Sequence, residues 1–176
     1  MSLAYRISGN NRERKWRLFL KTFPPRVSAH VLDVGFSNDE YSPTDNLIEK
    51  KYPYPAMVTA LGIEEPTLFR SKYPDVSVVL YDGKKFPFMY QQFDIVWSNA
   101  VIEHVGNRER QTLFLKEIAR VGKAAYITTP NRWFPFEVHT RVPLLHWFLP
   151  KEWFDRFLRF IGKGWAAGEY MNLFSE

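Results

Sequence analysis

The sequence of 176 residues contains no cysteine, and this absence removes several kinds of site at once. It excludes a disulfide framework, a thiolate zinc site and a cysteine nucleophile. A chain without cysteine fits a reducing compartment, so we predict a cytoplasmic protein. No run of residues approaches the roughly 20 apolar side chains that a membrane-spanning helix needs. The first thirty residues also lack the apolar segment of a secretory signal peptide.

Two further patterns are missing from the sequence. The chain has no Gly-x-Gly-x-x-Gly turn, which argues against a nicotinamide-dependent enzyme. His139 and His146 have no carboxylate partner at a recognisable metal-ligand spacing, so we predict no metal site.

Basic residues are concentrated at the amino terminus. Residues 1–30 carry seven basic side chains and one acidic one, so the rest of the chain sums to −1 although the net charge is +5. Trp16 and Phe19 recur there at helical spacing, and we predict a basic amphipathic helix that starts at Asn10 or Asn11 and ends before Pro24. Such a helix attracts anionic partners. The favoured interpretation of these basic residues is a solvated helix face, and we do not expect the helix to bind nucleic acid.

Strand-like and helix-like segments alternate along residues 30–130. Short apolar runs rich in β-branched residues predict five strands, at 31–35, 57–63, 76–81, from 93 onward and at 124–129. The alternation predicts βαβ units, a parallel sheet and right-handed crossovers. After residue 130 the pattern changes to an aromatic and basic loop and then to an amphipathic helix at 150–161.

Helix start and stop signals lie between the expected strands. Ser42 followed by Pro43 predicts that one helix begins there, and Pro66 opens a short one. Asn107 is the expected cap of a longer helix, and Gly122 is its expected closing residue.

Polar residues follow the apolar part of several expected strands. The first strand ends in Asp33-Val34-Gly35, the third in Asp82-Gly83, and the fourth turns polar at Ser98-Asn99 before Glu103-His104. Because the carboxyl ends of parallel strands share one edge of a sheet, these groups converge there. A glycine turn, an acid after the second strand and a polar group after the third are what a nucleoside cofactor needs.

The ordered set of motifs resembles a class I S-adenosylmethionine-dependent methyltransferase of the small bacterial, methyltransferase type 11-like branch. The matching segments are Val31–Gly35, Asp82–Gly83, Phe93–Val105, Glu117–Val121 and Ile127–Pro130. The resemblance implies a Rossmann-like three-layer αβα sandwich with a mainly parallel sheet of order 3-2-1-4-5. The family's closing sixth and seventh strands are expected to be missing.

The resemblance implies S-adenosyl-L-methionine as the cofactor and assigns residues to it. The implied cofactor-binding set is Asp33, Gly35, Ser37, Glu64, Asp82, Gly83, Asn99 and Ala100. Asp33 would lie beneath the turn that faces the methionine part, and Asp82 would bind the adenine amine. At the end of the second strand the family has an acid where this chain has Gly62, so Glu64 or Glu65 takes the ribose role. Asn99 and the next backbone unit would flank the sulfonium.

On the substrate side, the resemblance implies the residues Glu103, His104, Asn131 and Arg132. His104 is the candidate general base because its ordinary pKa range suits that role. The implied reaction is methyl transfer to a small-molecule or saccharide-type acceptor such as a glycan precursor. A rival hypothesis is a non-catalytic, degenerate methyltransferase fold that acts as a binding module, because the turn after the first strand has a single glycine.

Blander interpretations stay open at each residue. Asp33 and Gly35 also suit a plain strand-to-helix turn, Glu64 suits a solvated helix start, and Glu103-His104 suits a charge pair at a helix end.

We predict one domain over 1–176, with a basic helix at 1–29, a cofactor-binding core at 30–130 and an aromatic lid and helix segment at 131–176. Peripheral membrane contact through that segment and a homodimer stay open.

Overall fold

A computed structural model describes residues 3–42, 45–129 and 149–162 of the chain. The chain divides into two units, residues 1–99 with 115–127 and residues 100–114 with 128–176, and each is described by itself. In chain order the elements are α1 (Leu3–Thr22), β1 (Val31–Val34), α2 (Leu47–Lys51), η1 (Pro55–Met57), β2 (Val58–Gly62), α3 (Thr67–Lys72), β3 (Ser77–Leu80), β4 (Phe93–Asn99), η2 (Ile102–His104), α4 (Arg108–Val121), β5 (Gly122–Thr128) and α6 (Lys151–Phe160). No helix within these ranges is both long and apolar enough to cross a membrane.

The five strands form one sheet of order β3-β2-β1-β4-β5, as the sequence predicts. β1 lies in the middle and runs parallel to both neighbours, with Val31 opposite Val58 on one side and Ile95 on the other. All four residues of β1 are buried, which is expected for a central strand of a parallel sheet covered on both faces.

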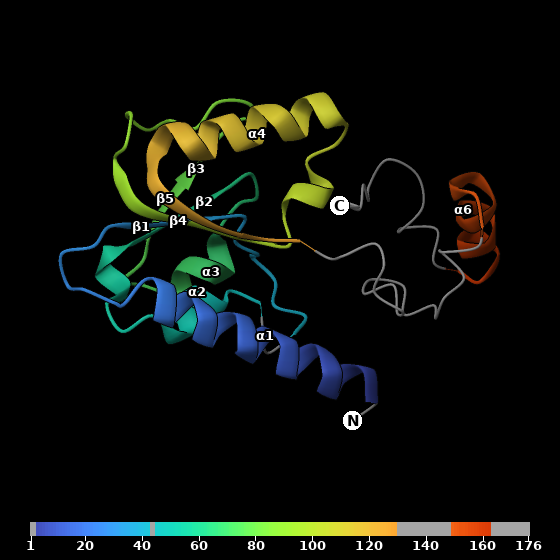
Figure 1. Cartoon of the computed structure of the whole chain (residues 1–176), viewed down its shortest axis with the longest axis horizontal. Coiled ribbons are helices and arrows are strands. Elements are labelled where there is room, and N and C mark those ends of the chain that lie inside the picture. Colours follow the sequence, from blue (N-terminus) through green and yellow to red (C-terminus); the bar gives the residue numbers. More distant parts are fainter. Residues whose placement is uncertain (1–2, 43–44, 130–148, 163–176) are drawn as a thin grey trace. The chain divides into compact units, whose positions relative to one another are not determined.

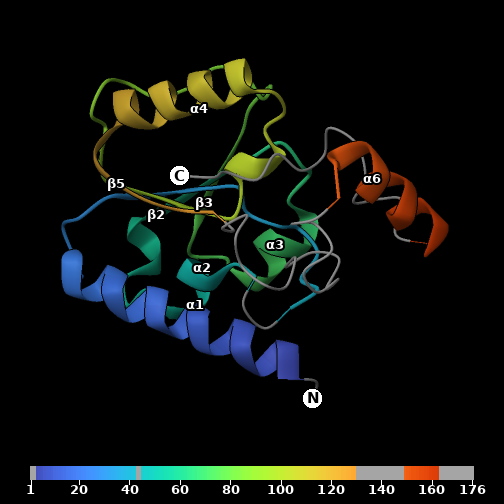
Figure 2. The same ribbon diagram turned by 45° about the vertical axis from the view of Figure 1, so that its right-hand side comes forward.

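Helices cover both faces of this sheet and confirm the three-layer architecture. Figures 1 and 2 show α1, α2 and α3 together on one face. The half of α4 that belongs to the same unit, from Leu115 onward, lies on the opposite face. Its side chains Ile118 and Val121 are almost completely buried. The right-handed βαβ connections expected from the alternating sequence pattern place the helices in this way.

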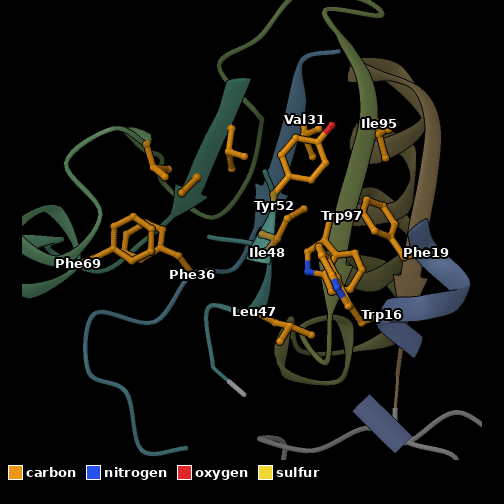
Figure 3. Packing of buried hydrophobic residues seen from close by; sticks show 13 residues of the cluster. Trp16, Phe19, Val31, Phe36, Leu47, Ile48, Tyr52, Phe69, Ile95 and Trp97 are labelled. Carbon is orange, nitrogen blue, oxygen red and sulfur yellow. The ribbon is translucent and has the colours of Figure 1, made fainter. Parts of the chain in front are cut away.

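Aromatic rings from α1 anchor that helix on β4 and β5. Phe19 is fully buried, and its ring centroid lies 4.8 Å from that of Trp97 and 5.4 Å from that of Tyr126. Figure 3 shows Trp16 and Phe19 gathered around Trp97, with Leu47 and Ile48 of α2 in the same cluster. The Tyr126 hydroxyl also donates a hydrogen bond of 2.9 Å to the carbonyl of Lys15. The apolar stripe recognised in the sequence therefore packs against the sheet.

Two predicted helix starts are wrong. α1 begins at Leu3, so Asn10 and Asn11 lie inside the helix and do not cap it. Helix propensity is a weak preference, and a polar residue inside a helix is tolerated when its neighbours pack well. α2 begins only at Leu47, because the Asp45 carboxylate accepts hydrogen bonds of 2.9 and 2.8 Å from the backbone N–H groups of Tyr41 and Ser42 and closes a turn there.

Gly122 also has a role other than the predicted one. It does not close α4 with a left-handed residue but begins β5 directly after Val121. A Cβ atom at this position would lie 2.5 Å from Cγ2 of Val96, so close approach to β4 requires glycine here. By contrast, the predicted cap at Asn107 is confirmed, since its side-chain oxygen accepts a hydrogen bond of 3.0 Å from the Arg110 N–H.

The predicted helix after Pro150 is confirmed as α6. Phe154 and Leu158 are buried, whereas Trp153 is 61% exposed and Phe160 is 88% exposed. The preceding loop, which includes His139 and His146, and the residues after 162 lie outside the described part of the chain.

Candidate functional site

The candidate site lies at the carboxyl ends of β1, β2, β3 and β4. Gly35 follows β1 with a φ of 101° and donates its N–H to the carbonyl of Leu61, at 2.8 Å. The N–H of Tyr81 after β3 donates to the carbonyl of Gly62, at 3.1 Å. These bonds align the first three strand ends. The predicted residues that lie along this edge are Asp33, Gly35, Ser37, Glu64, Asp82, Gly83 and Asn99.

The loop after β1 is held by asparagine side chains that the sequence analysis did not single out. Asn46 accepts a hydrogen bond of 2.9 Å from the N–H of Ser37 and donates one of 2.8 Å to its carbonyl. Asn38 accepts from the N–H groups of Leu68 and Phe69 at the start of α3, at 2.9 and 3.2 Å. With only one glycine, this loop is therefore shaped by side-chain hydrogen bonds. The left-handed backbone of Asn46, with a φ of 50°, is a conformation that asparagine tolerates, but sequence spacing does not reveal it.

Glu40 is a second residue of this loop that the sequence analysis missed. It accepts hydrogen bonds from the Tyr73 hydroxyl at 2.5 Å and the Asn46 amide at 3.1 Å, and it pairs with Lys50 at 2.9 Å and with Lys72. Burial opposes ionisation, but the hydrogen bonds outweigh it and hold the pKa of Glu40 at about 2. A cavity of about 300 Å³ adjoins this network and is lined by Asn38, Asp39, Glu40, Asn46, Leu68, Phe69, Lys72 and Tyr73.

Asp33 and a carboxylate of α2 that the sequence analysis also missed, Glu49, are both buried and affect each other's ionisation. Asp33 is 5% exposed and Glu49 is 6% exposed. Burial raises the pKa of Asp33 to about 7, although hydrogen bonding with Glu49 acts to lower it. Burial and the neighbouring Asp33 charge likewise raise the pKa of Glu49 well above its ordinary range. A buried carboxylate pair of this kind is a known mark of functional sites, although structural pairs also occur.

Asp82 is one of the residues that line a second, larger hollow. Its side chain is exposed, and one carboxylate oxygen accepts a hydrogen bond of 3.0 Å from the N–H of Lys84. The hollow has a volume of about 600 Å³. It is lined by Leu80, Tyr81, Asp82, Lys85, Phe86, Pro87, Phe88, Met89 and Gln92. Gly83 follows with a φ of 77°, which suits the turn that presents Asp82.

Phe36 explains why β2 ends in glycine and not in an acid. Its ring is 6% exposed, lies 4.6 Å from the ring of Phe69, and occupies the space where a Cβ atom of Gly62 would be (Figure 3 shows the two rings). No side chain fits at position 62 while this ring is in place. The nearest carboxylate after β2 is the exposed Glu64, two residues further along.

Gly62→Ala is expected to lower the free energy of unfolding by about 1–3 kcal/mol, because the new methyl group overlaps the buried Phe36 ring. Urea denaturation of the single variants Gly62→Ala and Phe36→Leu and of the double variant measures this. Since the two positions are in contact, the double variant should be more stable than the sum of the single effects predicts. Strict additivity would contradict the packing described for this loop.

On the other side of residue 99 the chain passes into the second unit. Ala100 has a φ of 59°, rare for a residue with a side chain, and its N–H donates to the carbonyl of Thr128 at 2.8 Å. Within η2, Glu103 is fully buried and accepts a hydrogen bond of 3.2 Å from the Thr129 hydroxyl. His104 is exposed. The predicted Asn131 and Arg132 lie outside the described residues, and in the described ranges no three histidine or acidic side chains cluster as metal ligands.

Comparison with known proteins identifies the family of this chain. Residues 32–125 match the model of a family described as a methyltransferase domain, and they make up more than half of the chain. Proteins of curated function give no match.

Several solved structures share the fold. The YcgJ protein of Bacillus subtilis is 19% identical, with a TM-score of 0.52, and the match covers 68% of this chain and 51% of that one. A S-adenosylmethionine-dependent methyltransferase of Aquifex aeolicus is 17% identical, with a TM-score of 0.52 and coverage of 84% and 78%. The PH0226 protein of Pyrococcus horikoshii is 25% identical, with a TM-score of 0.51 and coverage of 72% and 59%. The chain thus spans about half the length of the first of these. By the match over residues 32–125, the chain belongs to the methyltransferase domain family.

Proposed function

We propose that this chain binds S-adenosyl-L-methionine and transfers its methyl group to a small-molecule or saccharide-type acceptor. The observation that carries the proposal is a sheet of order 3-2-1-4-5 in a member of the methyltransferase family, whose neighbouring parallel strands β1, β2 and β3 end on the side where Asp33, Glu64 and Asp82 lie in the sequence. In open α/β sheets, ligands bind outside the carboxyl ends of the strands at the point where strand order reverses. Here that point lies between β1 and β4.

The residues present suit the chemistry of this cofactor. Its methionine part carries a cationic amino group, and the buried acid Asp33 comes two residues before the Gly35 turn that would receive it. Glu64 is an exposed acid that would bind the ribose hydroxyl groups, and Asp82 would accept a hydrogen bond from the adenine amine. Ser37 and Gly83 shape the two turns, and Asn99 with Ala100 would flank the reacting sulfur.

When bound, the cofactor supplies a methyl group made electrophilic by its sulfonium. The chain's own contribution is to hold the acceptor in line with that group and to keep water out, since alignment alone supplies a large part of such a rate enhancement. His104 is the candidate base that would take a proton from the acceptor. The buried Glu103 remains a predicted residue of the acceptor side. Asn131 and Arg132 remain predicted acceptor contacts.

One observation favours the rival hypothesis of a non-catalytic binding module. The N–H of Ser37, in the turn that would receive the methionine part, already donates to Asn46. A binding module of this fold would bind no cofactor, whereas the proposed enzyme would. Titration calorimetry with S-adenosylhomocysteine separates the two hypotheses, because undetectable binding at millimolar ligand would overturn the enzyme hypothesis.

Asp82→Ala is expected to weaken S-adenosylhomocysteine binding by about tenfold to a hundredfold, because a hydrogen bond to a charged group is worth about 1.5–3 kcal/mol. Asp82 is exposed, so the free energy of unfolding should change little. Asp75→Ala, an exposed acid before β3, is the matched control and should keep wild-type affinity. Unchanged affinity in Asp82→Ala would place the adenine subsite elsewhere.

A further inference from the structure

A hollow separates the loop after β1 from α3. The cavity of about 300 Å³ is lined on the loop side by Asn38, Asp39, Glu40 and Asn46, and on the helix side by Leu68, Phe69, Lys72 and Tyr73. Because this space holds no side chains, close packing does not fix the loop against α3 there. Polar contacts that cross the hollow fix it instead, and Asn38 supplies them at the start of α3.

Glu40 supplies the contacts at the other end of α3. Its Oε1 atom accepts hydrogen bonds from the Tyr73 hydroxyl at 2.5 Å and from the Asn46 amide at 3.1 Å. Its Oε2 atom pairs with the amine of Lys50 at 2.9 Å and with that of Lys72. The Glu40 side chain is only 14% exposed, and these cations and donors compensate its charge. One carboxylate thus joins the loop to both α2 and α3.

The Asn46 amide extends this contact to Ser37. Its Nδ2 atom donates to Glu40 and, at 2.8 Å, to the carbonyl of Ser37, while its Oδ1 atom accepts from the Ser37 N–H at 2.9 Å. The flipped amide would set an oxygen against the carboxylate and an N–H group against another N–H group, so Glu40 favours the orientation that is seen. The N–H and the carbonyl of Ser37 belong to the two peptide planes that flank it, and both planes are therefore fixed.

These contacts determine the shape of a turn that contains one glycine. The N–H of Gly35 donates to the carbonyl of Leu61, which fixes the start of the turn, and the Asn46 amide fixes its end at Ser37. A turn already held in one shape loses little conformational freedom when a ligand binds. Apparent affinity falls by the fraction of molecules in which the turn has that shape. A residue that holds the turn therefore raises affinity without contacting the ligand.

We propose that Glu40 is a positioning residue of the cofactor site: its carboxylate holds the Asn46 amide, and that amide holds the Gly35–Ser37 turn in the shape that receives the cofactor's methionine part. This rests on the proposed function. Under this inference, the hydrogen bond from the Ser37 N–H to Asn46 belongs to a preformed site, and it does not indicate that the site is lost.

The test is titration calorimetry of the full chain with S-adenosylhomocysteine, with urea denaturation to confirm that each variant is folded. Glu40→Gln removes the charge and replaces one acceptor oxygen with a donor. It should weaken binding by about tenfold, the effect of a correctly shaped turn in only about one-tenth of the molecules. Tyr73→Phe is a milder second variant, because it removes one donor to Glu40 and keeps the ring that packs on Phe69. It should weaken binding by about threefold.

Asn46→Gly separates a positioning role from a merely structural one. Glycine readily adopts the left-handed φ of 50° found at position 46, so the variant removes the amide and keeps the backbone. Because Glu40 acts through this amide, Glu40→Gln should weaken binding by less than about twofold when Asn46 is already glycine. A residue that only stabilised the fold would lower the free energy of unfolding and leave the affinity of the folded chain unchanged.

Glu13→Gln is the matched control. Glu13 of α1 also pairs with a lysine of α2, Lys51, at 2.5 Å, and its second ion pair is with Arg17 of its own helix. Neither partner belongs to the loop after β1. The variant thus loses an ion pair to α2 and should keep wild-type affinity.

The outcomes separate this inference from the proposed function. Wild-type affinity in folded Glu40→Gln would overturn the inference and leave the methyltransferase proposal standing. A tenfold loss that recurs when Asn46 is glycine would do the same, because Glu40 would then not act through the amide. If Glu40→Gln failed to fold, unchanged affinity in Tyr73→Phe would overturn the inference. Absence of S-adenosylhomocysteine binding to the wild type at millimolar ligand would overturn both.

Discussion

Phe19→Ala is expected to lower the free energy of unfolding by about 3–5 kcal/mol, the range typical of removing a buried aromatic ring. Phe19 has no exposed surface, and four aromatic rings surround it. The centroid distances are 5.4 Å to Trp16, 5.7 Å to Phe23, 4.8 Å to Trp97 and 5.4 Å to Tyr126. Because Trp97 and Tyr126 come from β4 and β5, the variant removes the contact that ties α1 to the sheet. Urea denaturation followed by far-ultraviolet circular dichroism measures the loss.

Leu18→Ala is the matched control for this prediction. Leu18 is the preceding residue of the same helix but is 53% exposed, so its removal should change the free energy of unfolding by less than about 0.5 kcal/mol. If Phe19→Ala cost no more than Leu18→Ala, α1 would not be packed on the sheet as described. Phe19→Ala should also disturb the packing around the candidate site, because Phe19 contacts Trp97, which lies opposite Asp33 in the strand register.

The strands of this fold could be predicted because their signal is local. Each apolar run is short and bounded by polar or turn residues, and β1 to β5 all lie within a few residues of their expected positions. The sheet order followed from the resemblance and from the rule that such crossovers are right-handed. The acids Asp33 and Asp82 could be placed at one edge for the same reason, since parallel strands end together.

What could not be predicted depends on contacts between distant residues. The start of α2 is set by the Asp45 turn, and the loop after β1 is set by Asn46, which bonds to a residue nine positions earlier. Gly62 stands where the family has an acid because the Phe36 ring, from a distant part of the sequence, fills the space beside it. Glu49 gave no sequence signal, because an acid in a short helix is ordinarily solvated and only the sheet beneath α2 makes it buried.

The buried pair also predicts an unusual dependence of stability on pH. The pKa of Asp33 is raised in the folded chain from an ordinary 3.8 to about 7, so the folded state keeps a proton that the unfolded state has already released. The contribution of Asp33 to the free energy of unfolding is fully present below pH 4 and is lost as pH rises through about 7. The loss amounts to about 4 kcal/mol, at 1.36 kcal/mol per unit of pKa difference. Glu40, Asp94 and Glu117 have lowered pKa values, so the stability that they contribute is lost only as pH falls through the acidic range.

Between pH 5 and 8 the pair should therefore dominate, and the free energy of unfolding of the chain without cofactor should fall as pH rises. Asp33→Asn removes the group whose raised pKa falls in this range, so its stability should be nearly independent of pH between pH 5 and 8. At pH 8 it should exceed the wild type by about 3 kcal/mol, the usual cost of an uncompensated buried charge, while at pH 5 the two should differ by less than about 1 kcal/mol. Urea denaturation of both chains at each pH measures this, with Glu109→Gln as the exposed control. A wild-type curve that is flat from pH 5 to 8 would mean that Asp33 and Glu49 are both ionised and compensated in the folded chain, because only a retained proton makes the folded and unfolded states differ in proton number over that range.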